Sequence, residues 1–176
     1  MILHMISKRL YTVLAILLVS NVVIGPLRAE SVGFPKDHPV FTIEVPKDWK
    51  AMFDSNTSLS IKCISERGFI ITEMSSVHDK DSARKFLEGF IKYICQGKGA
   101  TDVEQTPVLE RPLTKNIAGL EISCSGNVFA GLEKASIEYS MTAFSLDGKR
   151  FFSISGFGFS GSVDQRRIEE SIKAAK

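Results

Sequence analysis

The 176-residue sequence contains few of the residue types that build catalytic and metal sites. It has three histidines, three cysteines and one tryptophan, and no group of them shows the usual ligand spacing of a zinc site. It also contains neither a Gly-x-Ser-x-Gly nor a His-Glu-x-x-His motif. The sequence therefore offers no catalytic set, and we expect no metal, no cofactor and no enzymatic activity.

Long apolar runs are also absent, apart from one at the N-terminus. Lys8 and Arg9 precede an apolar stretch over residues 10–24, and Ala29 places a small residue before Glu30. This order is typical of a secretory signal peptide, with cleavage between Ala29 and Glu30. The alternative is an uncleaved membrane anchor, but the run is shorter than the roughly 20 apolar residues that cross a bilayer. No cysteine stands at the cleavage point, which argues against a lipid-anchored form.

The predicted exported chain has little net charge of either sign. The whole sequence has 22 basic and 20 acidic side chains, and removal of residues 1–29 takes Lys8, Arg9 and Arg28 but no acidic residue. This leaves 19 basic and 20 acidic side chains. The basic character belongs to the targeting segment, so we expect no nucleic-acid partner and no membrane contact beyond that segment before cleavage.

The remaining composition suits one globular domain. Hydrophobic residues make up 44% of the chain and charged residues 24%, which excludes a disordered or fibrous protein. We expect residues 1–29 to be the signal peptide, residues 30–39 a flexible lead, and residues 40–176 a single domain.

Hydrophobic periodicity predicts an α+β fold within residues 40–176. Alternation indicates a strand at 40–46, a hairpin at 59–64 and 69–74, and a three-stranded meander at 120–125, 137–142 and 151–157. Spacing of three and four predicts a helix that begins at Asp79 or Asp81 and ends at Gly97 or Gly99. Asp147-Gly148 predicts a type I′ turn between the last two strands.

A second helix is predicted at the C-terminus. Ser162 and Gln165 have the spacing of a capping box, Ile168 and Ile172 mark the inward side, and Glu169 and Lys173 form an i,i+4 pair. The order is strand, β-hairpin, helix, three-stranded meander and C-terminal helix. We expect a mostly antiparallel sheet with both helices packed on it.

Two segments carry a resemblance to a known family. The opening FTIEVPKDWK and the closing IEESIKAAK, with the hairpin, helix and meander between them, resemble the PsbP/Mog1-like α/β-sandwich family. The resemblance covers roughly residues 40–176 and implies the sandwich fold. It also implies a non-enzymatic binding, assembly or accessory domain.

A glycine pattern between the last strand and the last helix resembles a dinucleotide fingerprint. Residues 156–161 read GFGFSG, which matches Gly-x-Gly-x-x-Gly. The fingerprint also needs a second parallel strand and an acidic residue about 20 positions later, and the sequence supplies neither. We interpret the glycines as a strand exit that lets the helix pack closely, with anion binding at the helix start as the alternative.

His38 and His78 each stand beside an aspartate, Asp37 and Asp79. A metal or acid–base site would require the two loops to meet and a third ligand to join them. Solvated loop residues are the simpler interpretation.

The three cysteines all lie in the predicted exported part. An oxidising compartment favours one disulfide and one remaining thiol, and three pairings are possible. We predict that Cys95 pairs with Cys124, because both lie on apolar phases and a helix-to-sheet bridge fits disulfide geometry. Cys63 would then be a buried thiol.

Two further side-chain sets have competing interpretations. Trp49 and four phenylalanines are expected in the core, with an aromatic ligand surface as the alternative. Polar residues of the meander are expected on a solvated face, with a docking surface as the alternative. The phenylalanines are Phe151, Phe152, Phe157 and Phe159, and the polar residues are Ser123, Ser125, Ser140, Thr142, Ser153 and Ser155.

Together these features predict an exported, non-catalytic binding or accessory protein of the periplasm, cell envelope or secreted space, with a protein or envelope partner. One alternative is a small secreted hydrolase or metal-dependent enzyme that uses His38 or His78. Another is a membrane-tethered domain that keeps its N-terminal segment.

Overall fold

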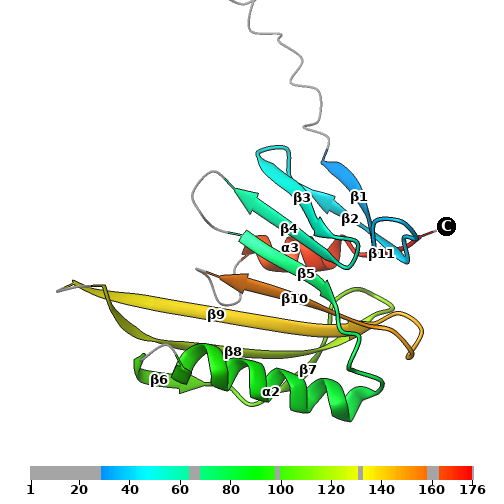
Figure 1. Ribbon diagram of the computed structural model, residues 1–176. Coiled ribbons are helices and arrows are strands. Elements are labelled where there is room, and N and C mark those ends of the chain that lie inside the picture. The colour runs from blue at the N-terminus through cyan, green and yellow to red at the C-terminus, as the bar shows by residue number, and fades with distance from the viewer. Residues whose placement is uncertain (1–28, 64–67, 98–99, 131–132, 158–162, 176) are drawn as a thin grey trace, which may run out of the picture.

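Two antiparallel sheets and two helices make up the described part of the protein (Figure 1). The structure, a computed structural model, describes residues 29–63, 68–97, 100–130, 133–157 and 163–175. The strands are β1 (Glu30–Phe34), β2 (Phe41–Val45), β3 (Trp49–Ser55), β4 (Ser58–Cys63), β5 (Gly68–Glu73), β6 (Thr101–Gln105), β7 (Leu109–Pro112), β8 (Ala118–Ala130), β9 (Glu133–Ser145), β10 (Phe151–Phe157) and β11 (Lys173–Ala174). The helices are α2 (Lys80–Gly97) and α3 (Val163–Glu170).

The larger sheet has eight strands in the order β3-β4-β5-β10-β9-β8-β6, with β7 also paired to β8. Every strand pair is antiparallel, and β8 and β9 are 13 residues long. The predicted hairpin is the β4–β5 pair, and the predicted meander is β8-β9-β10. The antiparallel α+β class predicted from the sequence is therefore present. Among the described residues, no helix is long and apolar enough to cross a membrane.

A second sheet, β1-β2-β11, and helix α3 lie against one face of the larger sheet. The core between them is aromatic: Phe41 is fully buried and contacts Phe144 and Phe152 edge-on, with ring centroids 5.4 and 5.0 Å apart. Each such side chain favours folding by about 1.5–3 kcal/mol through burial. Trp49 stacks on Phe69 at the margin of this core, as expected for a core residue.

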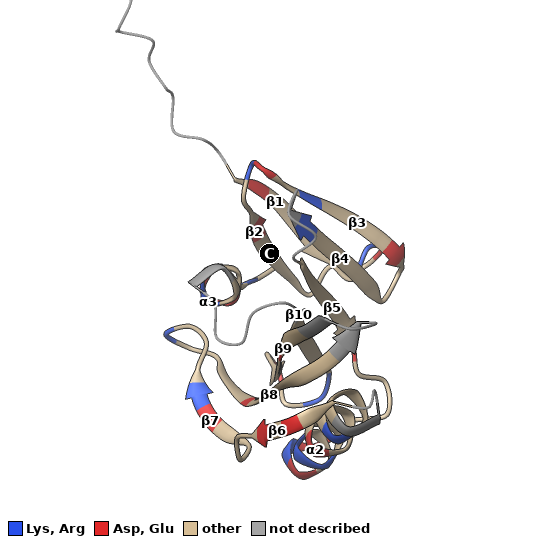
Figure 2. Cartoon of the chain, turned by 90° about the vertical axis from the view of Figure 1, so that its left-hand side faces the viewer, with Lys and Arg blue, Asp and Glu red and all other residues tan. Residues whose placement is uncertain are grey.

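Helix α2 covers the opposite face of the larger sheet (Figure 2). Leu87, Ile91 and Cys95 recur at four-residue spacing and are buried against β8 and β9. The amide of Ser82 donates to Asp79 Oδ1 at 2.7 Å, so Asp79 caps the first turn, as the sequence predicted.

Strands also occupy three stretches for which the sequence predicted no strand. The lead at residues 30–39 contains β1, which pairs with β2 from Glu30 to Phe34. The stretch after Pro46 contains β3, and the proline-containing linker contains β6 and β7, both paired to β8. Of these, β1, β6 and β7 are short strands of four or five residues at sheet edges.

The link between β9 and β10 differs from the predicted turn. It spans five residues, 146–150, and Gly148 has φ +74°. Asp147 has no positive φ, which a type I′ turn would require. Its carboxylate instead accepts bonds from the amides of Lys149 and Arg150, at 2.8 and 3.0 Å.

Helix α3 is seated on the large sheet by buried polar contacts. Glu169 is fully buried and accepts a hydrogen bond from Thr142 Oγ1 at 2.8 Å and one from Gln165 Nε2 at 3.1 Å. It also pairs with Arg111 of β7. Burial lowers the pKa of Arg111, but the hydrogen bonds and charges of Glu169 and Glu121 together outweigh it and leave the pKa raised.

The partners of Glu169 correct one sequence prediction. The i,i+4 pair with Lys173 does not form: Lys173 Nζ binds Glu44 Oε1 at 2.8 Å on β2. Ile168 and Ile172 are buried as predicted. Gln165 contacts Ser140 within the core, and Ser162, the other half of the predicted capping box, lies outside the described residues.

Candidate functional site

The face of the large sheet that carries α2 is only partly covered. Helix α2 contacts β8, β9 and β6, while β10 and β5 continue beyond it. Between the helix and these two strands lies a groove of about 310 Å³, which we call the α2 groove. It is lined by Ile70, Thr72, Glu73, Met74, Ser75, Ser76, Phe86, Phe90, Tyr139, Met141, Ser153 and Ser155.

The floor of the α2 groove comes from neighbouring strands in register. Thr72 of β5 pairs with Ser153 of β10, and Ile70 pairs with Ser155. Side chains directly opposite each other in an antiparallel pair point to the same face. Short hydroxyl side chains therefore form a floor below the level of the helix.

One hydroxyl of this floor has no hydrogen-bond partner among the described residues. Ser153 is 3% exposed, and within the described part of the chain its Oγ makes no hydrogen bond. Every fully enclosed side-chain oxygen or nitrogen of the described residues has a partner, so this hydroxyl opens on the groove. Ser155, 6% exposed, has one long bond of 3.4 Å to the carbonyl oxygen of Ile70. A nearly buried hydroxyl that is free and lines a groove points to a ligand or ordered water.

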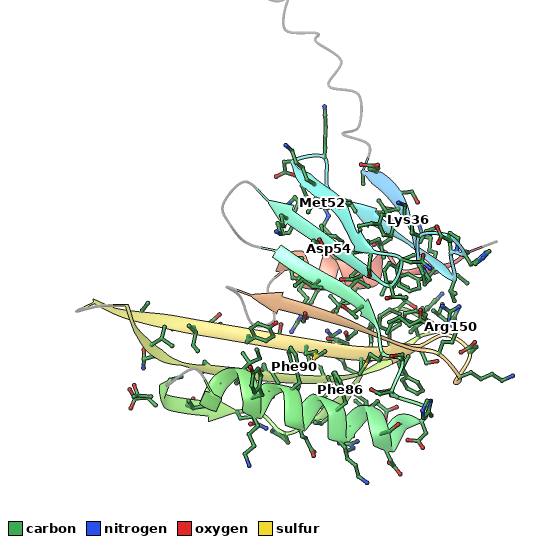
Figure 3. The ribbon with its side chains drawn as sticks, viewed as in Figure 1. Lys36, Met52, Asp54, Phe86, Phe90 and Arg150 are labelled. Atoms are coloured by element: carbon green, nitrogen blue, oxygen red, sulfur yellow. A yellow bond between two sulfur atoms is a disulfide. The ribbon has the colours of Figure 1, made fainter. Side chains whose placement is uncertain are left out.

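The wall of the groove is aromatic. Phe86 and Phe90, one turn apart on α2, stack with centroids 6.0 Å apart and planes at 10° (Figure 3). Phe90 also contacts Tyr139 of β9 at 6.1 Å. Phe86 has the three- and four-residue spacing of the apolar face of α2, but it is 37% exposed, because the helix has more apolar residues than β8 and β9 cover.

The rim of the groove is electrically neutral. Glu73 is the one charged side chain among the described residues that line it. Arg150 Nε donates to Glu73 Oε1 at 2.8 Å, and this bond raises the pKa of Arg150. Because the carboxylate already has its counter-charge, the groove favours an uncharged ligand over a cation.

A second cavity, of about 390 Å³, lies at the N-terminal end of α2. Charged side chains that line it already have partners within the protein: Lys80 Nζ binds Glu110 Oε2 at 2.6 Å, and the carboxylate of Asp79 accepts a hydrogen bond from the amide of Ser82. The amide of Gly148 donates to Ser145 Oγ at 2.9 Å. Although this cavity is larger, its described lining offers no nearly buried free hydroxyl, so the α2 groove is the better candidate site.

The polar residues of the meander do not share one face. Ser140 and Thr142 are fully buried beneath α3, whereas Ser153 and Ser155 lie on the α2 side. The expectation of a single solvated face is therefore wrong for these four residues. In the β9–β10 pair Ser140 lies opposite Gly156, and Ser155 lies opposite Met141. Successive residues of a strand point to opposite faces of the sheet, so Ser140 and Ser155 lie on different faces.

His38 and His78 are exposed, and neither lines either of these two cavities. His38 lies in the β1–β2 link of the smaller sheet, and His78 lies just before α2 on the other side of the large sheet. Within the described residues, no three histidine, cysteine or acidic side chains are placed to hold a metal ion.

The glycine pattern at residues 156–161 begins within β10, and only its first two residues are among those described. A Cβ on Gly156 would lie 2.8 Å from Gln165 Oε1 and 3.0 Å from Phe69 Cε1. A side chain here would have to displace the end of Gln165 of α3 and the ring of Phe69, which agrees with the interpretation that glycine lets the helix pack closely on the strand. Residues 158–161, Phe159 among them, lie outside the described residues.

Cys95 and Cys124 lie at disulfide distance, as predicted, with Cα atoms 6.7 Å apart. They join the C-terminal half of α2 to β8, and both are buried. This link holds the helix that carries the aromatic wall of the groove. The side chain of Cys63 is not described.

Comparisons with known proteins give no family. No protein-family model and no curated protein matches the chain. A crystal structure of a protein from Bacteroides thetaiotaomicron VPI-5482 is similar at a TM-score of 0.48 and 12% identity. The match covers 85% of this chain and 49% of that one, so the chain spans about half of that protein's length.

Proposed function

We propose that the protein is an exported, non-catalytic binding protein whose ligand site is the α2 groove. The single observation that carries this proposal is Ser153, a 3%-exposed side chain whose hydroxyl lines the groove without a partner in the described chain. A pocket with mostly apolar walls and a few placed polar groups is the usual form of a small-molecule site.

The lining supports one class of ligand over others. The stacked pair of Phe86 and Phe90 favours a flat ring, and Ser153 favours an oxygen or nitrogen acceptor on it. The Glu73–Arg150 pair leaves no charge for an ionic ligand. We therefore propose a neutral, ring-bearing molecule with a hydrogen-bond acceptor.

The proposal also requires α2 to remain packed on β8 and β9, since the helix supplies one wall of the groove. The Cys95–Cys124 contact supports this packing and supports export to an oxidising compartment. The signal peptide predicted from the sequence also supports export. The PsbP/Mog1-like resemblance stays a prediction, and it agrees with a binding role.

Titration with Nile red, a neutral, flat dye with a carbonyl acceptor, tests the proposal. The full chain is expressed, and the protein is purified from the compartment to which it is exported. Phe86→Ala should weaken dye binding about tenfold, because the loss of an aromatic contact costs ~1.4 kcal/mol. Ser153→Ala should weaken it about threefold or more, through the loss of one hydrogen bond.

Tyr93→Ala is the matched control. Tyr93 lies on the same helix, is 71% exposed and does not line the groove. It should leave dye binding unchanged. Equal binding by the wild type, Phe86→Ala and Ser153→Ala would show that the dye binds elsewhere and would overturn the proposal.

A further inference from the structure

Strand β3 lies at one edge of the large sheet, and among the described strands it pairs only with β4. Figure 1 shows β3 as the outermost arrow of that sheet. Its outward residues Lys50, Met52 and Asp54 are all exposed, and Met52 is 56% exposed. A free edge with a large exposed apolar residue at its centre can accept another strand.

The sequence of β3 is complementary to itself in antiparallel pairing. If two copies pair with Met52 opposite Met52, Lys50 of each copy lies opposite Asp54 of the other. On the inner face the same register places Ala51 opposite Phe53. The pairing therefore brings together one apolar contact at the two-fold axis and two pairs of opposite charge.

Charges within the single chain also favour this partner. Lys50 lies directly opposite Lys62 of β4, and within the described residues neither ammonium group has an acidic partner. Like charges directly opposite in a sheet are destabilising. A carboxylate from a second copy, beside Lys50, would relieve this repulsion.

We propose that β3 pairs with β3 of a second copy of this chain, in antiparallel register centred on Met52. Figure 3 shows Met52 and Asp54 on this strand. The register shifts between Phe53 and Ser55, so the regular edge is short and the pairing depends on Met52 and the two charge pairs. The dimer is accordingly concentration-dependent, and it forms independently of the α2 groove.

Charge exchange tests this register. Lys50→Asp places two aspartates opposite each other in both charge pairs, and Asp54→Lys places two lysines there. Each variant alone should have a dimer Kd raised about tenfold or more, because two favourable pairs become repulsive. An equimolar mixture of the two should form a heterodimer, since every facing pair is then of opposite sign. Sedimentation velocity over a range of concentrations measures all three samples.

Asp54 also contacts Ser60 within the chain, so each variant is first compared with the wild type by urea unfolding.

A second measurement is independent of charge. Met52→Cys should form an intermolecular disulfide at the two-fold axis, because directly opposed Cα atoms lie ~4.5–5.5 Å apart. Tyr93→Cys, exposed on α2, is the control and should not cross-link.

Three results would overturn the proposal. One is a wild-type protein that stays monomeric at every concentration, which would mean that the β3 edge is solvated or binds a different protein. The second is a dimer that is as stable in Lys50→Asp as in the wild type. The third is a Met52→Cys protein that cross-links no faster than Tyr93→Cys.

Discussion

Replacing Arg111 by methionine should destabilise the protein by about 3 kcal/mol, the lower end of the cost of breaking a buried ion pair. Glu169 is fully buried, and its carboxylate would keep only the neutral donors Thr142 Oγ1 and Gln165 Nε2. The lower figure applies because the Arg111 side chain is 22% exposed and also pairs with Glu121. Urea unfolding measures the effect as a midpoint shift of about 1–3 M.

A double-mutant cycle separates the pair from the general cost of the substitution. Glu169→Gln keeps an acceptor for Thr142 and leaves Arg111 with Glu121, so it should cost about 1 kcal/mol. The double variant has no unpaired buried charge and should be more stable than Arg111→Met alone. A loss below about 1 kcal/mol for Arg111→Met, or no coupling between the two positions, would refute the reasoning.

Two further predictions follow from local contacts. The hydrogen bonds from the amide and hydroxyl of Ser82 hold the pKa of Asp79 below its usual value. The ionised Asp79 carboxylate therefore stabilises the folded protein at pH values above the unfolded pKa of about 3.9. This stabilisation is lost as the pH falls through the lower pKa of the folded state. Asp79→Asn keeps the cap without the charge, and urea unfolding should show wild type and variant converging below about pH 4; a constant difference would contradict this. The intact mass of the exported protein should correspond to a chain that begins at Glu30. When this protein is unfolded without reductant and treated with an alkylating reagent, its mass should increase by one alkyl group, at Cys63. Three alkylated thiols would disprove the Cys95–Cys124 bond.

Strong amphipathic patterns were sufficient to predict the central elements of the fold. The alternation around Ile122, Met141 and Ile154 identified the meander, and the spacing of Leu87 and Ile91 identified α2. Strands β1, β6 and β7 were missed, because short edge strands carry few buried residues. β3 was missed for another reason: its inward residues, Ala51 among them, are only partly buried, and Pro46 indicated only the end of the preceding strand.

Long-range polar contacts could not be predicted from local sequence. Glu169 and Lys173 have the spacing of a helical ion pair, but α3 ends at Glu170. Lys173 then belongs to β11 and meets Glu44, while Glu169 meets Arg111, 58 residues earlier in the chain. Whether a polar residue faces water or a buried partner depends on which element covers it, and periodicity does not supply that information.

The α2 groove could nevertheless have been inferred in part. A helix with apolar residues at Phe86 and Phe90 as well as Leu87 and Ile91 has a wider apolar arc than packing on two strands requires. The predicted bond between Cys95 and Cys124 places that helix over β8, the strand of the meander farthest from β10. The face of β10 beside the helix is then left uncovered, and a wide apolar arc next to an uncovered strand leaves room for a ligand. What the sequence did not supply is the pairing of β10 with β5, which extends the floor and gives the groove its second side.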